Sequence, residues 1–171
     1  MTRRAWTALG LAEATFLIAY PAFTYLAYAV IDADGADGGS DLGQSFMIVL
    51  GGMFAILVMI PIAVHTAGRL TEMGTADWSR RSAAVAHLLV GLGLGAMGAA
   101  VAAVVIGGAG SGAFAAIVFV VPSGIAGFAT HLLMPVALRH LWFRTLAWVI
   151  AALPIVGAAL LVAFGVVRSV T

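Results

Sequence analysis

Four ionisable side chains interrupt stretches of this chain that are otherwise apolar: Glu13, His65, His87 and His131. An ionisable group in an apolar segment is costly unless it meets a partner, water or a ligand, and such groups often mark functional sites. Imidazoles can carry protons or bind metal ions, and a carboxylate can pair with them. The four residues therefore predict one polar site, provided that the segments carrying them lie together.

The segments around these residues have the composition of membrane spans. The chain has 171 residues, of which 63% are hydrophobic and only 9% are charged, whereas soluble domains are about 25% charged. A membrane-spanning helix needs about 20 mostly apolar residues. We therefore predict an all-α integral membrane protein, with residues 1–171 forming a single domain. Its five expected transmembrane helices cover residues 8–31, 46–68, 83–108, 113–138 and 145–167.

Arginine in the short connections predicts the orientation of these helices, because basic loops stay on the cytoplasmic side. One side would carry seven arginines, and the other only Arg168 together with the acidic stretch 32–45. We expect a cytoplasmic N-terminus and an outer C-terminus. The seven are Arg3, Arg4, Arg69, Arg80, Arg81, Arg139 and Arg144. The bias toward Arg, Ala, Gly and Val, with no Lys, suggests a bacterial cytoplasmic membrane as the location.

In that orientation Glu13, His65, His87 and His131 all fall in the inner half of the bilayer, on four different helices. His131, the deepest histidine, would lie roughly 10 Å above the inner end of its helix at a rise of 1.5 Å per residue. Glu13 also begins a polar stripe at helical spacing that continues through Tyr20, Thr24 and Tyr28.

Small residues predict which helix faces pack. Gly91, Gly95, Ala99 and Ala103 are four apart, so they share one face of a helix with His87. Small residues at this spacing let two membrane helices approach closely. We therefore expect the helix over 83–108 to be the central one of the bundle. Gly124 and Gly127 share a face with His131 in the same way.

The function that these patterns favour is non-enzymatic. Glu13, His65, His87 and His131 would bind or pass a small polar species or a proton, and Tyr20 and Thr24 would line a route outward. The chain has no internal repeat, so a homo-oligomer or a partner membrane subunit is expected within the lipid bilayer. The net charge of +1 gives no indication of nucleic-acid binding.

Three alternatives remain open. Two of His65, His87 and His131 could hold a b-type haem. All three with Glu13 could bind Zn²⁺ or Fe in a membrane enzyme, although no metal-binding motif marks such a site and the metal stays unknown. The third alternative is a structural or assembly protein in which each histidine bonds a nearby backbone carbonyl. Cysteine is absent, which excludes disulfides and thiolate ligands.

Overall fold

The computed structural model describes residues 2–33, 55–106 and 111–170 of the chain. Within these ranges every regular element is a helix and no strand occurs, which confirms the all-α prediction. The acidic residues 34–45, residues 46–54 of the expected second span and most of the glycine-rich turn at 107–112 lie outside the described residues.

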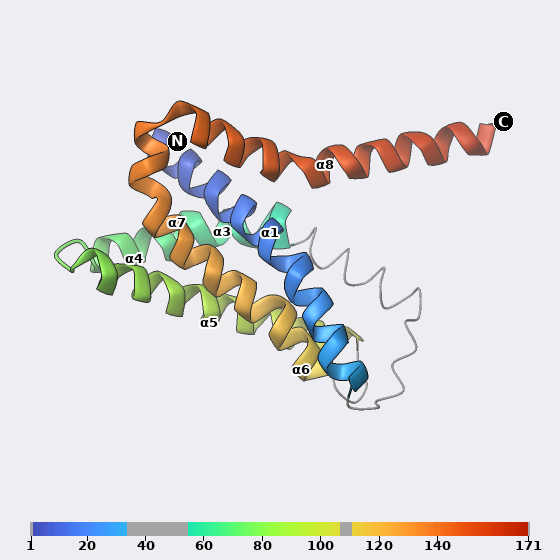
Figure 1. Cartoon of the computed structure of the whole chain (residues 1–171), viewed down its shortest axis with the longest axis horizontal. Coiled ribbons are helices and arrows are strands. Elements are labelled where there is room, and N and C mark those ends of the chain that lie inside the picture. Colours follow the sequence, from blue (N-terminus) through green and yellow to red (C-terminus); the bar gives the residue numbers. More distant parts are fainter. Residues whose placement is uncertain (1, 34–54, 107–110, 171) are drawn as a thin grey trace.

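The helices form five consecutive segments, in agreement with the expected number (Figure 1). The first is α1 (Arg3–Ala33), the third is α5 (Arg80–Ile106) and the fifth is α8 (Leu141–Val170). The second segment joins π-helical η1 (Ala55–Met59), α3 (Ile60–Ala63), π-helical η2 (Val64–Gly68) and α4 (Arg69–Gly74). The fourth joins α6 (Ser111–Ala115), π-helical η3 (Ala116–Val120) and α7 (Val121–Arg139).

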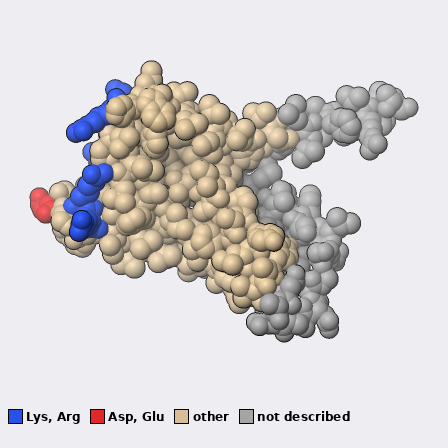
Figure 2. Space-filling model, in the orientation of Figure 1, with Lys and Arg blue, Asp and Glu red and all other residues tan. Residues whose placement is uncertain are grey.

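Three of the described helical stretches are long and apolar enough to cross a membrane: Arg3–Val30, Arg80–Val104 and Gly112–Arg139. A shorter apolar stretch, Leu141–Pro154, begins α8. The described arginine side chains gather at one end of the molecule (Figure 2), where α1, α5 and α8 begin and α7 ends. We call this the arginine end, defined by Arg3, Arg4, Arg80, Arg139 and Arg144.

Proline explains two of the π-helical stretches. Pro61 follows η1 and Pro122 follows η3, each within two residues of the end of the π-helix. Proline lacks an amide hydrogen and cannot donate to the carbonyl one turn earlier, so the preceding turn loses a hydrogen bond and widens. α5 contains no proline and runs without interruption for 27 residues.

Two helix ends have local causes in the sequence. The Ser79 hydroxyl oxygen accepts a hydrogen bond from the Ser82 backbone N–H at 3.2 Å and so caps the start of α5, as expected from its position. The connection between the fourth and fifth expected spans is shorter than the residues left between 138 and 145, because α7 extends to Arg139 and α8 begins at Leu141. His140 alone separates α7 from α8, in an extended conformation with φ −112° and ψ 110°.

The expectation that residues 83–108 form the central helix is also wrong. α7 packs against α1, α5 and α8, whereas α5 packs mainly against α7 and η3. The physical reason is that the buried residues of α5, which include Ala84, His87, Gly91, Gly95 and Ala99, lie on only one face of that helix. Residues on several sides of α7 are buried, and they include Gly124, Ala126, Thr130, Met134 and Ala137.

Candidate functional site

A close crossing of α5 and α7 positions two of the expected site residues. A Cβ atom at Gly95 would stand 2.7 Å from the Phe119 carbonyl oxygen, and one at Gly91 would collide with the Ser123 carbonyl. A Cβ atom added at Gly127 would likewise collide with the His87 carbonyl oxygen. At Gly124 the absence of a side chain leaves room for the side chain of Leu92. These four glycines lie where α5 meets the fourth helical segment. Further along α5, Ala99 is buried and Ala103 packs against the same apolar core.

This crossing brings His87 and His131 together. Their ring centroids are 4.5 Å apart with an angle of 31° between the ring planes, so the expected approach of these two residues is confirmed. His87 is buried and His131 is half-buried. The crossing of α5 and α7 therefore places the two imidazole rings in contact.

Two histidines bond to their own helices through Nδ1. The His87 Nδ1 donates to the Ala83 carbonyl oxygen and the His65 Nδ1 donates to the Pro61 carbonyl oxygen, both at 2.8 Å. A carbonyl oxygen only accepts, so Nδ1 carries the hydrogen and Nε2 of the neutral ring is left as an acceptor. The His65 Nε2 is buried without a hydrogen-bond partner among the described residues.

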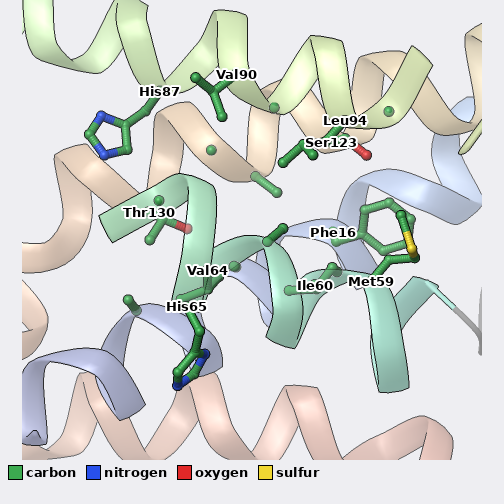
Figure 3. A pocket seen from close by; sticks show the side chains of 18 of the residues that line it. Phe16, Met59, Ile60, Val64, His65, His87, Val90, Leu94, Ser123 and Thr130 are labelled. Atoms are coloured by element: carbon green, nitrogen blue, oxygen red, sulfur yellow. The ribbon is translucent and has the colours of Figure 1, made fainter. Parts of the chain in front are cut away.

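His65, His87 and His131 line one cavity of about 920 Å³, bounded by α1, the second helical segment, α5 and α7. Toward the arginine end the cavity is lined by Arg4, Arg69, Glu72, His87 and His131. Its other part is mostly apolar, with Ser123 as a polar lining residue, and the cavity as a whole is partly open to the surroundings. Figure 3 shows His87, Thr130 and His65 on one side and Phe16, Met59 and Leu94 toward the other. The cavity therefore has a polar part and an apolar part.

The carboxylate at this cavity is that of Glu72, and not that of Glu13. The Glu72 Oε1 lies 3.1 Å from an Arg4 guanidinium nitrogen, in an ion pair that is partly exposed. Sequence reasoning placed Glu72 in a connection, whereas α4 continues the helical segment to Gly74. The sequence does indicate that Glu72 lies near His65, because Glu72 follows His65 by seven residues, which is the spacing of two helical turns.

Glu13 is buried in α1 but is not among the residues that line the cavity. Its carboxyl group forms no ion pair or hydrogen bond with any other described residue. Within the described part of the chain, Glu13 therefore does not share a site with the three histidines, contrary to expectation.

The polar stripe beyond Glu13 is a packing surface. Tyr20 stacks on Phe16 with ring centroids 5.2 Å apart and contacts Phe119 at 5.7 Å. Tyr28 meets the edge of Phe114 at 5.0 Å. The Thr24 hydroxyl donates to the Tyr20 carbonyl oxygen at 2.8 Å. Tyr20 and Thr24 do not line the cavity, so the geometry gives no support for a route outward along this face.

The histidines do not fit the expected haem site. Axial imidazoles approach a haem iron from opposite faces with a nitrogen toward the metal, whereas His87 and His131 stand side by side with centroids 4.5 Å apart. Figure 3 shows the His65 ring pointing away from the His87 ring. The described residues also contain no group of three or more His, Asp or Glu side chains with the geometry to hold a metal ion.

Comparisons of the chain with protein-family models, with curated proteins and with solved structures found no match.

Proposed function

We propose that this chain is a multi-pass protein of the bacterial cytoplasmic membrane that binds a small molecule with a polar group in the cavity beside His87 and His131. The observation that carries the proposal is the convergence of His65, His87 and His131 from three helical segments on one cavity. A volume of about 920 Å³ lies within the range of small-molecule sites.

The chemistry of the polar part supports binding over an exclusively structural role. Nε2 of His87 is left as an acceptor at the cavity because Nδ1 is engaged with Ala83. It can accept a hydrogen bond from a hydroxyl or ammonium group, or take up a proton and donate to an anion. Glu72 and Arg4 add an acceptor and a donor at the same end.

Binding is better supported than passage across the membrane. A route outward would have followed Tyr20 and Thr24, and that face of α1 packs on aromatic side chains. Assembly with a second copy or with a partner subunit remains part of the proposal, because one chain without an internal repeat is a small unit for transport.

A mass measurement tests the binding function. The protein is purified in mild detergent and analysed by native mass spectrometry, which detects molecules that remain bound. We expect a retained small molecule whose occupancy falls in His87→Ala and His131→Ala. His140→Ala is the control, because His140 is exposed between α7 and α8. Equal occupancy in all three variants, or no retained molecule in the unmodified protein, would contradict the proposal.

A structural role is the second candidate, and a specific observation favours it. His65 and His87 each bond to a carbonyl oxygen of their own helix, which satisfies part of their polarity without a ligand. For this candidate, His87→Ala is expected to lower the thermal stability of the protein while leaving the masses of bound molecules unchanged.

A further inference from the structure

The polarity of the cavity changes along its length. On α5 the lining runs from His87 near the arginine end to Ala102, which is about 22 Å at 1.5 Å per residue. That length exceeds one leaflet of a hydrocarbon core, roughly 15 Å thick. Beyond His87 the residues of α5 that line the cavity are all apolar, namely Val90, Gly91, Leu94, Gly95, Met97, Gly98, Val101 and Ala102.

The polar part of the cavity has an excess of positive charge. Arg4, Arg69 and Glu72 are its charged lining residues, and the Glu72 carboxylate already pairs with Arg4. The Arg69 guanidinium forms no ion pair with the other described residues, so its charge at the cavity is not neutralised. A smaller hollow beside it adds Arg80 near His131. An anionic group is the complement of this end.

A lipid has the same distribution of polarity. In the orientation expected from the distribution of arginine, the arginine end lies at the cytoplasmic interface and the apolar part of the cavity runs toward the middle of the bilayer. A lipid of that leaflet presents its headgroup and its chains in the same order. Because the cavity as a whole is partly open, an acyl chain that enters it from the same leaflet keeps its orientation.

We infer that the cavity binds an anionic membrane lipid, with its phosphate group near Arg69 and Arg4 and one acyl chain between α5 and the second helical segment. This inference rests on the proposed function and names the class of its ligand. The cavity would recognise a negative headgroup together with the apolar chain that is joined to it. The adjacent rings of His87 and His131 border the position of the headgroup.

Photo-crosslinking in vesicles tests the inference. The protein is reconstituted with phosphatidylglycerol that carries a diazirine at the end of one acyl chain, and the crosslinked peptides are mapped. Phosphatidylcholine with the same label is the comparison, because its headgroup carries a phosphate but no net charge. We expect crosslinks on the apolar lining, including Leu94 to Ala102 and Phe119, with about fivefold more label from the anionic lipid, given the usual contribution of one arginine near a membrane surface.

Pairs of matched variants test where the acyl chain and the headgroup of the lipid bind. Leu94→Trp places a bulky ring in the cavity (Figure 3), whereas Leu89→Trp makes the same change on the exposed face of α5. We expect the first to remove most of the crosslinking and the second to leave it unchanged. Ala102→Leu is a smaller obstruction in case Leu94→Trp does not fold. Arg69→Gln should reduce the anionic preference, and Arg81→Gln, which does not line the cavity, should keep it.

The outcomes separate this inference from the proposed function. Equal labelling by both lipids that is abolished by Leu94→Trp would overturn the anionic preference while supporting a binding cavity. Labelling confined to the outer face of α5 and insensitive to both Leu94→Trp and Ala102→Leu would overturn lipid binding in the cavity. The native mass measurement with His87→Ala then tests the proposed function on other small molecules.

Discussion

At the scale of single residues, polar groups in this protein meet their hydrogen-bonding needs within their own helix where they can. Thr7, Thr24, His65 and His87 all donate to a carbonyl oxygen four residues earlier. These local bonds explain how an apolar chain tolerates polar side chains without distant partners. They also determine which imidazole nitrogen remains available at the cavity, which is Nε2 in both His65 and His87.

The Tyr28 hydroxyl is a polar group that this arrangement leaves without a partner among the described residues. An unsatisfied buried hydroxyl costs about 1–3 kcal/mol relative to a bonded one. Tyr28→Phe is therefore expected to leave the free energy of unfolding unchanged or to raise it by up to about 1 kcal/mol. Tyr28→Ala removes the ring contact with Phe114 as well and should lower it by several kcal/mol.

Unfolding of both Tyr28 variants in detergent, followed by circular dichroism, measures this difference. A clear loss of stability in Tyr28→Phe would mean that the hydroxyl has a hydrogen-bond partner.

At the scale of elements, the glycines of α5 divide into two kinds that the sequence does not distinguish. A Cβ atom added at Gly91 or Gly95 would lie closer than van der Waals distance to the backbone of the fourth helical segment. A Cβ atom added at Gly93 would meet nothing within 4 Å. All three lie within five residues of one another. Only the crossing with η3 and α7 makes two of them necessary.

Gly95→Ala and Gly93→Ala should therefore change stability in opposite directions. The added methyl at Gly95 would lie 2.7 Å from backbone atoms of Phe119 and Val120 and must push two helices apart, at a cost of about 1–3 kcal/mol. At Gly93 the same change removes a residue that is unfavourable in helices and should stabilise by up to about 1 kcal/mol. Thermal unfolding of both variants in one detergent measures the contrast. Equal effects would show that the strip on α5 faces lipid.

At the scale of the whole molecule, the arginine side chains that the structure describes gather at one end (Figure 2). They lie where α1, α4, α5 and α8 begin and where α7 ends. In a membrane this distribution favours a cytoplasmic position for that end. It also places the polar part of the cavity, with Arg4 and Arg69, at the same interface.

Reporter fusions at the C-terminus test this orientation. We expect alkaline phosphatase fused after Thr171 to be active and a fluorescent protein at the same position to be dark, because the C-terminus is proposed to lie outside. The same reporters in the connection at Trp78 should give the reverse pattern. A bright fluorescent fusion at the C-terminus would show that the fifth helical segment does not cross the membrane.

The sequence by itself determined the helical class, the number of helical segments and the glycines of the close crossing. Each follows from a local pattern: apolar runs specify helices, and small residues four apart specify a smooth face. The pairing of His87 with His131 also followed, because both share a face with glycines that require a close neighbour.

Only the tertiary structure decided which carboxylate reaches the cavity and which helix is central. Glu13 and Glu72 are both plausible from spacing, but the rotation of α1 against its neighbours determines whether Glu13 faces the cavity. That rotation results from packing over all of α1, including contacts of Gly10 with Trp148 of α8. Likewise α7 became central because it buries residues on several sides, and the sum of those contacts is a property of the assembled bundle.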